Sequence, residues 1–391
     1  MKLSAACGMV GALAVLAGCA PVEGMPQAPR PTPSAVRLIG RTVLPTGAAT
    51  DTMPVGGISG IDYDAGQQRW FMISDDRSQQ GPARFWELRI DYDIDRAPTA
   101  QALAARRLQT QAGAAFPQPG LGEEAADAES LRASPLDGLL IWSSEGDARD
   151  EYGPAVRRME TSGSPRGAVP LPGILKAGDD GHSGPRPNLS IEGLAFAPGG
   201  RSLWISMEAP LLQDGLPPNA HDGARVRLSR LAYPSGDLLA QYAYPLDPIG
   251  PFPAGRLADN GVSEILALGK DHLLVLERSG IQQADGDFRY RVRLYCAAVA
   301  GASDIGKLAS LRGAAITAMR KSLVVDLAQV LPGDVDNVEG MTFGPVLGNG
   351  HSSLVLVTDN NFSPRHASQV IALEILSRRN QTTMIRALCS P

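Results

Sequence analysis

The chain has 391 residues, of which 43 are glycine and 31 are proline, together about 19% against an average near 12%. So many helix-breaking residues exclude a protein built from long helices. The 43% of hydrophobic residues and the mean hydropathy of -0.07 exclude wholesale disorder and a polytopic membrane protein. The net charge of -5 excludes a broad basic surface, so we expect no nucleic-acid partner.

The first 20 residues have the features of a bacterial secretory signal in the usual order, with Lys2, an apolar run and then small residues. The motif Leu16-Ala17-Gly18-Cys19 is similar to the lipobox of bacterial lipoproteins, where cleavage precedes a cysteine that then takes a diacylglycerol. We predict a signal peptide over residues 1–18, lipidation of Cys19, and attachment to a membrane of the bacterial cell envelope, in the periplasm or at the outer membrane. An ordinary signal peptide or a membrane anchor with an incidental cysteine is the alternative.

The segment after Cys19 is rich in proline, with five prolines between residues 21 and 33. It favours an extended tether over residues 19–35, at about 3 Å per residue, followed by a domain over residues 36–391. Cys7 leaves with the signal and Cys19 takes the lipid, so Cys296 and Cys389 remain as a possible disulfide pair in an oxidising compartment. Two buried free thiols are the alternative.

From residue 57 onward, one sequence unit recurs five times. Each copy has a polar residue beside a glycine or small residue, an apolar strand, a short turn and a second apolar strand that ends in an acid. The first polar residues are spaced by 70, 63, 72 and 75 residues, and they are Ser59, Glu129, Glu192, Glu264 and Glu339. Further β-rich or alternating segments follow each pair, for example 83–91 and 290–298, so each repeat holds about four strands.

A four-stranded unit repeated in this way is typical of a β-propeller, in which the innermost strand of each blade lines a central channel. The sequence therefore predicts an all-β propeller of four-stranded blades, five by repeat count. A sixth, degenerate blade and a pair of β-sandwiches are the alternatives. Residues 36–44 precede the first copy and can supply the outer strand of the last blade, which would close the ring.

In a propeller these repeats bring nine carboxylates to one region near the axis. The predicted metal ligands are Glu129, Glu192, Glu264, Glu339, Asp75 and Asp359, and Glu145, Glu208 and Glu277 end the other strands. Crowded carboxylates repel one another, and Ca²⁺ takes six to eight oxygen ligands, so we predict Ca²⁺ as the cofactor. The alternative is that these acids accept hydrogen bonds from backbone N–H groups of neighbouring blades and hold the ring in register.

Arginines follow some of these acids directly, and a guanidinium suits phosphate oxygens. We predict Arg77, Arg278 and Glu208 as catalytic residues, with structural ion pairs as the alternative for the arginines. The sequence has no G-x-S-x-G elbow, no H-E-x-x-H, no Cys-His cluster and no P-loop. These absences disfavour a serine esterase of the α/β-hydrolase kind, a zinc protease and a nucleotide-binding enzyme.

Three stretches, beginning at Ser74-Asp-Asp-Arg-Ser78, Ile191-Glu-Gly-Leu194 and Asn337-Val-Glu-Gly340, resemble the phytase-like domain family, also described as "esterase-like activity of phytase". The resemblance runs from about residue 39 to the C-terminus. It implies an exported bacterial propeller related to calcium-dependent phytases, and a hydrolase of phosphoesters or esters.

Together, the residues and the resemblance predict a monomeric envelope lipoprotein that hydrolyses a small phosphorylated or ester substrate with the help of a metal. A non-catalytic propeller that binds an envelope partner or a sugar-like ligand is the alternative, followed by other hydrolases such as lactonases.

Overall fold

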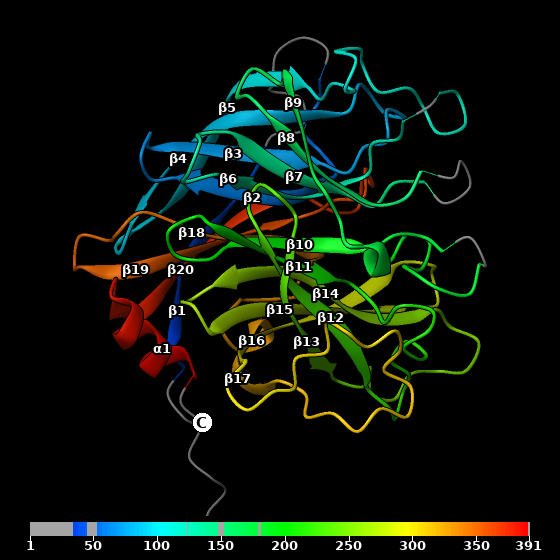
Figure 1. Cartoon of the computed structure of the whole chain (residues 1–391). Helices are drawn as coiled ribbons and strands as arrows, with labels where there is room; N and C mark the ends of the chain where they lie inside the picture. The colour runs from blue at the N-terminus through cyan, green and yellow to red at the C-terminus, as the bar shows by residue number, and fades with distance from the viewer. Residues whose placement is uncertain (1–33, 45–52, 123, 148–151, 179–180, 390–391) are drawn as a thin grey trace, which may run out of the picture. The chain divides into compact units, whose positions relative to one another are not determined.

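Figure 1 shows the computed structural model of the chain, which describes residues 34–44, 53–122, 124–147, 152–178 and 181–389. The predicted signal peptide, the lipidation site Cys19 and nearly all of the predicted tether lie outside the described residues. Within these ranges, the elements other than strands are α1 (Gln381–Cys389) and two short 3-10 turns at Gly173–Leu175 and Leu327–Gln329. None of the described helices is long and apolar enough to cross a membrane.

The strands form five four-stranded antiparallel sheets, which are the blades of a five-bladed β-propeller. Blade one is β2 (Ile58–Asp64), β3 (Arg69–Ser74), β4 (Arg84–Asp93) and β5 (Arg96–Arg107). Blade two is β6 (Ala128–Ala133), β7 (Leu140–Ser144), β8 (Ala155–Met159) and β9 (Pro165–Val169). Blade three is β10 (Ile191–Phe196), β11 (Ser202–Met207), β12 (Ala224–Ala232) and β13 (Leu238–Leu246). Blade four is β14 (Ala258–Ala267), β15 (His272–Gln282), β16 (Phe288–Ala298) and β17 (Arg320–Asp326).

The fifth blade joins the two ends of the domain. It consists of β18 (Val338–Phe343), β19 (His351–Thr358), β20 (Gln369–Arg378) and, on its outer edge, β1 (Val36–Val43). β1 runs antiparallel to β20, with Val36 opposite Ile375 and Val43 opposite Gln369. The predicted five-bladed propeller and its closure by the first strand are both confirmed.

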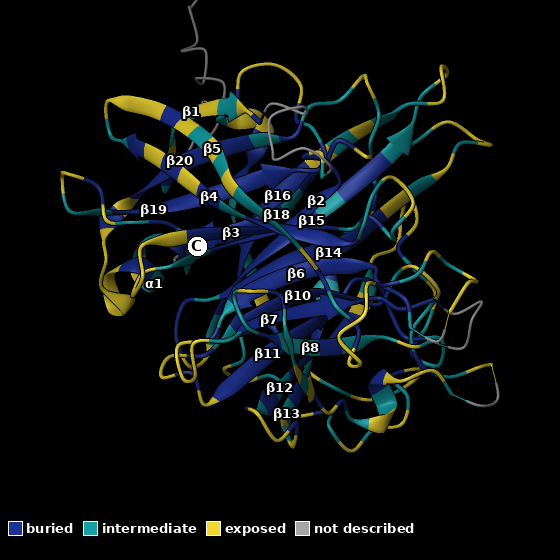
Figure 2. Ribbon diagram, turned by 90° about the horizontal axis from the view of Figure 1, so that it is seen from above, coloured by how far each residue is buried: buried dark blue, intermediate teal, exposed yellow. Residues whose placement is uncertain are grey.

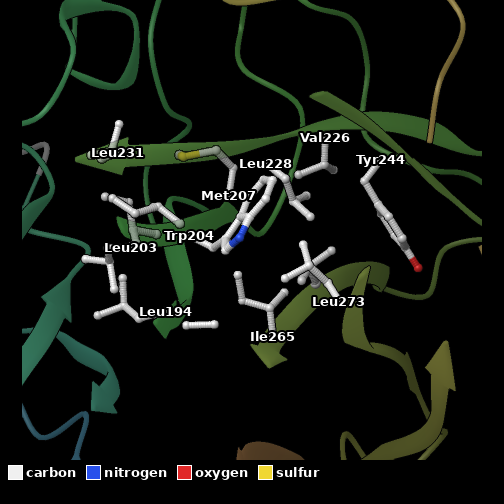
Figure 3. Close-up of a cluster of buried hydrophobic side chains, with 14 of the residues drawn as sticks. Leu194, Leu203, Trp204, Met207, Val226, Leu228, Leu231, Tyr244, Ile265 and Leu273 are labelled. Atoms are coloured by element: carbon white, nitrogen blue, oxygen red, sulfur yellow. The ribbon is translucent and has the colours of Figure 1, made fainter. Parts of the chain in front are cut away.

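The inner strands are the most buried part of the domain, whereas loops and outer strands carry the exposed residues (Figure 2). Each inner strand contacts the next around the ring, from β2 through β6, β10 and β14 to β18 and back to β2. The blades pack face to face through apolar side chains. Trp204 of β11, which is fully buried, packs among side chains that include Ile265 of β14 and Leu273 of β15 in the next blade (Figure 3).

Cys296 and Cys389 form a disulfide, with their Cα atoms 5.2 Å apart. The bond joins β16 of blade four to α1, which follows the last strand of blade five. The structure thus selects the bonded form of the pair that the sequence left open, and the C-terminal helix is held covalently to a neighbouring blade.

Candidate functional site

A register shift near the start of every inner strand marks a β-bulge, which gives the five blades a common reference point. The shifts lie between Ile58 and Gly60 in β2, between Ile191 and Gly193 in β10, and between Val338 and Gly340 in β18. Corresponding shifts occur in β6 and β14. Aligned on the bulges, the equivalent residues are Ser59, Glu129, Glu192, Ser263 and Glu339.

Blade four departs from the repeat that the sequence predicted. Its register shift lies between Val262 and Glu264, so Ser263 and not Glu264 takes the position of the other glutamates. Val262, the residue before the bulge, pairs with Glu277, and Arg278 comes directly after this partner. The equivalent residues of the other blades are Asp75, Glu145, Glu208 and Asp359. The predicted equivalence of Glu264 and Glu277 with these acids is wrong by one residue, and blade four places a guanidinium where the others place a carboxylate.

Glu264 instead faces Arg132, whose guanidinium lies 2.7 Å from its carboxylate. It also accepts hydrogen bonds from the Ser130 hydroxyl of blade two at 2.9 Å and from the backbone N–H of Leu194 in blade three at 3.2 Å. Burial raises the pKa of Glu264 to about 7, and Arg132 opposes this increase. Glu277 is also fully buried and accepts a hydrogen bond from the Tyr244 hydroxyl at 2.7 Å. Glu264 and Glu277 therefore fit the structural alternative, in which the acids hold the blades together.

The other acids gather around a cavity of about 240 Å³, which we call the acidic cavity. Its lining includes eight carboxylates, contributed by Asp75, Asp127, Glu129, Glu145, Glu192, Glu208, Asp259 and Glu339. Arg278 is the one cationic side chain among the described residues that line it, and Asn188, Leu189, Tyr290, Asn337 and Asn361 complete the lining. Asp359 lies beside the cavity, fully buried, with an oxygen 3.5 Å from the Asn337 amide nitrogen that also donates to Glu339.

Two carboxylates of the acidic cavity accept no hydrogen bond from the described residues. Glu129 is 9% exposed and Glu192 is 8% exposed, and no side chain or backbone group in the described ranges donates to either one. One oxygen of Asp75 is likewise buried without a hydrogen-bond partner. Keeping each of these groups as a bare anion in the folded protein costs free energy, so the cavity favours either bound protons or a bound cation.

The pKa values of these acids reflect the same crowding. Burial and then the charge of Glu192 raise the pKa of Glu129 well above its usual range, and burial and then Glu208 do the same for Glu192. Burial, followed by the charge of Glu339, raises the pKa of Asp75 to about 7. Burial, followed by Asp127, raises the pKa of Glu145 to about 8. Without a metal, the cavity therefore binds protons more tightly than ordinary carboxyl groups do.

The geometry of the carboxylates fits a metal ion. Asp127, Glu129 and Glu145 place one oxygen each within 4.8 Å of one another, and Glu145, Glu192 and Glu208 form a second such group. Glu145 belongs to both groups. Since every ligand atom is a carboxylate oxygen, the set suits a hard divalent cation such as Ca²⁺ and not a soft metal. Of the predicted ligands, Glu129 and Glu192 belong to these groups, whereas Asp75 and Glu339 line the cavity outside them.

The two predicted catalytic arginines differ in their surroundings. Arg278 lies 3.2 Å from a Glu208 oxygen and 3.2 Å from the Asn337 side-chain oxygen, and its Nε has no hydrogen-bond partner. Burial lowers the pKa of Arg278, but the surrounding carboxylates outweigh burial and raise it above its ordinary value. Arg77 is not among the described residues that line the cavity, and it pairs with Asp147 and lies 3.6 Å from Asp127. Arg278 thus faces the cavity, whereas Arg77 fits the structural ion-pair alternative.

Sequence reasoning missed several of the lining residues. Asp127 and Asn337 each come two residues before a bulge glutamate, so an alignment of the repeats two positions upstream would have found them. Glu145 was recognised as a strand end without being assigned to the metal. Asp259 occurs in blade four at a position with no acidic counterpart in the other repeats, so no periodic signal marks it.

The family model described as "Phytase-like: Esterase-like activity of phytase" matches residues 53–362. The chain belongs to this family. Among solved structures, this phytase-like chain is similar to the catalytic domain of the Coprinopsis cinerea GH62 alpha-L-arabinofuranosidase, with a TM-score of 0.42 and 12% identity over 87% of this chain and 98% of that chain.

Two further solved structures have lower scores. The alpha-L-arabinofuranosidase PaAbf62A from Podospora anserina gives a TM-score of 0.40 and 10% identity over 87% of this chain and 98% of that chain. The tail fiber of Staphylococcus aureus phage P68 gives 0.36 and 9% over 91% of this chain and 55% of that chain. A comparison with curated proteins found no match.

Proposed function

We propose that this phytase-like propeller is a hydrolase of a small phosphorylated or ester substrate that depends on a divalent cation and acts in the acidic cavity. The observation that carries the proposal is the pair of carboxylate groups that share Glu145 and include Glu129 and Glu192, beside the guanidinium of Arg278. Membership of the phytase-like family supports hydrolysis as the reaction class.

Asp127, Glu129, Glu145, Glu192 and Glu208 would hold the cation. When bound, a divalent cation polarises a phosphoryl or acyl oxygen and lowers the pKa of an attacking water.

The remaining groups of the cavity then have separate tasks. Arg278 binds an anionic oxygen of the substrate and stabilises the charge that develops on it. Asp75 lines the cavity outside the two carboxylate groups, so its carboxylate is available as the general base that takes a proton from the attacking water. Asn337, through its hydrogen bond from Arg278, positions the guanidinium.

We further infer that the domain works as a monomer at the bacterial cell envelope, attached through lipidated Cys19. The lipobox-like motif Leu16-Ala17-Gly18-Cys19 supports this location. The disulfide between Cys296 and Cys389 supports it independently, since such bonds persist in oxidising compartments. Replacing Cys19 with serine should release the protein into the soluble fraction or leave it unprocessed; a variant that matures and still fractionates with membranes would contradict the anchoring.

The cation is tested by thermal unfolding of the purified domain with Ca²⁺ and with EDTA. A ligand that binds only the folded state stabilises it by about 2.7 kcal/mol at a hundredfold excess over Kd, which we expect to raise Tm by a few degrees. Glu192→Gln should lose most of this increase, because it removes a ligand and also relieves repulsion in the metal-free protein. Asp95→Asn, at an exposed acid away from the cavity, is the matched control and should keep the response. A melting curve indifferent to both Ca²⁺ and EDTA would refute the metal site.

Catalysis is tested with 4-nitrophenyl phosphate and 4-nitrophenyl acetate as substrates. Turnover should require the cation, and Arg278→Met should lower kcat/KM by about 10² to 10³, as expected for losing a donor to developing charge. Arg278→Lys, which keeps the charge without the planar fork, should recover part of the loss. Calcium binding without turnover of either substrate would favour the non-catalytic binding module.

A further inference from the structure

We propose that the substrate of this site carries one anionic group and one aromatic or similarly bulky apolar group, and that a pocket beside Arg278 receives the apolar part. This pocket, called the side pocket below, has a volume of about 340 Å³. It shares Asp259, Arg278, Tyr290 and Asn361 with the acidic cavity and adds Phe288 and His366. The inference rests on the proposed function, because it assigns the substrate class of the same site.

The side pocket has an aromatic wall next to the guanidinium. Phe288 and Tyr290 are alternate residues of β16 and share one face of the strand. Their rings stack, with centroids 6.3 Å apart and planes 23° apart. The Arg278 guanidinium carbon lies 5.9 Å from the centre of the Tyr290 ring. A planar apolar group attached to an anion held by Arg278 would therefore lie against ring surfaces that are only half-buried in the free protein.

The cationic side chains around both cavities are few, which favours a substrate with a single anionic group. Arg278 and His366 are the cationic residues among the described lining of the two cavities. Both nitrogens of His366 are already occupied, one by Asp336 at 3.0 Å and the other by Asp287 at 2.8 Å. Arg365, the residue before His366, already lies 3.8 Å from Asp287, so a second or third phosphate would compete with the carboxylates for a cationic group. The site is therefore suited to a single phosphate or comparable anion.

The loops that surround the side pocket are held in place before any ligand binds. His366, between β19 and β20, connects to Asp287 in the β15–β16 turn and to Asp336 ahead of β18. The Asn361 N–H donates to Asp359 at 2.9 Å, and the Phe362 N–H donates to the Asn360 side chain at 3.2 Å. A preformed pocket of this kind gives affinity without the cost of ordering its walls.

Two non-hydrolysable probes test the proposal, phenylphosphonate and methylphosphonate, titrated calorimetrically into the purified domain in Ca²⁺ buffer. Phenylphosphonate should bind about tenfold more tightly, the value of one good aromatic contact. Phe288→Ala should reduce the affinity for phenylphosphonate by a similar factor and leave that for methylphosphonate within about twofold. Phe288→Tyr keeps the ring and should keep the preference. Phe343→Ala, at a half-buried phenylalanine at the opposite end of an inner strand, is the matched control.

Equal affinity for the two phosphonates, no binding of either, or an unchanged preference in Phe288→Ala would overturn the proposal. Tighter binding of a polyphosphorylated inositol than of phenylphosphonate would also overturn it. The results that would refute the proposed hydrolysis are different from those that would refute the side pocket. An aryl preference that depends on Phe288 without any turnover leaves the side pocket standing and removes the hydrolase, whereas turnover without an aryl preference does the reverse.

Discussion

Arg132 is the residue on which the five blades converge. Its guanidinium donates to one carbonyl from each inner strand, at 2.7 to 3.2 Å, and the acceptors are Ile61, Leu131, Leu194, Ile265 and Met341. The residue is 3% exposed, and Glu264 balances its charge at 2.7 Å. A guanidinium has five N–H groups in a planar fork, so it can satisfy five surrounding carbonyls where a lysine cannot. Arg132 therefore fills the axis of the propeller.

Replacing Arg132 with methionine should destabilise the domain by about 3–5 kcal/mol, because five buried carbonyls would lose their donor and Glu264 would lose its counter-charge. The double variant Arg132→Met/Glu264→Gln should recover part of the loss. Urea unfolding followed by tryptophan fluorescence measures both values. A single variant within about 0.5 kcal/mol of the wild type, the range of ordinary surface substitutions, would show that Arg132 does not connect the blades.

Most of the acidic site could be predicted from the recurrence of one residue type at one strand end. The repeat correctly brought Glu129, Glu192 and Glu339 to the same cavity. It fails in blade four, where the spacing indicates Glu264 and the bulge places Ser263 at the equivalent position. A bulge inserts a residue without changing the composition of the strand, so a register error of one residue turns a side chain to another environment.

At the scale of elements, the fold was predictable because the strands are bounded by turn residues and repeat at a similar length. The closure by β1 was predictable from the number of strands in each repeat, since the last repeat has only three strands of its own and β1 has no partner in the first. Pairing with β1 also covers β20, whose buried residues would otherwise lie at an open sheet edge. The contacts of α1 were not predictable, because nothing in the repeat indicates a helix after the fifth blade.

The disulfide gives α1 its covalent attachment, and its loss should be measurable. The bond closes a loop of 93 residues between Cys296 and Cys389, so Cys296→Ser/Cys389→Ser should lower the free energy of unfolding by about 2–5 kcal/mol. The wild type in reducing buffer should lose a similar amount, and the variant should be insensitive to the reductant. A wild-type melting temperature that does not change on reduction would contradict a stabilising role for this bond.

At the scale of the whole molecule, the two ends of the inner strands have different chemistry. Eight carboxylates surround the acidic cavity at one end. A larger cavity of about 590 Å³ at the other end is lined by Tyr63, Phe196 and Phe343 among others, with Arg132 also in its lining. The larger cavity has two acids, Asp62 and Asp64, and two arginines, Arg132 and Arg379, among its described lining residues. The described lining of the acidic cavity has only Arg278 against its carboxylates, so the excess negative charge lies at the acidic end. The stability of the molecule should therefore respond to pH and to cations mainly through that end.

In EDTA, the domain should lose stability as the pH rises from about 5 to 8. The pKa values of Asp75, about 7, and of Glu145, about 8, exceed those of ordinary carboxyl groups. Over this range the folded state binds more protons than the unfolded state, so the free energy of unfolding falls as pH rises. Saturating Ca²⁺ should flatten the decrease, because the cation replaces the protons as the counter-charge.

His366 also lowers the stability of the domain as the pH rises, so its contribution must be measured separately from that of the cavity. Burial lowers the pKa of His366, but its bond to Asp287 and the charge of Asp336 outweigh burial and raise it above 6.5. The stability from this histidine is complete below pH 6.5 and is lost as the pH rises through the raised value. His366→Gln removes this contribution and should leave the part that Ca²⁺ reverses, whereas Glu192→Gln should reduce that part. Thermal unfolding in EDTA at pH 5, 6, 7 and 8 measures each slope, and a wild-type melting temperature that stays constant or rises over this range would contradict a crowded, proton-binding cavity.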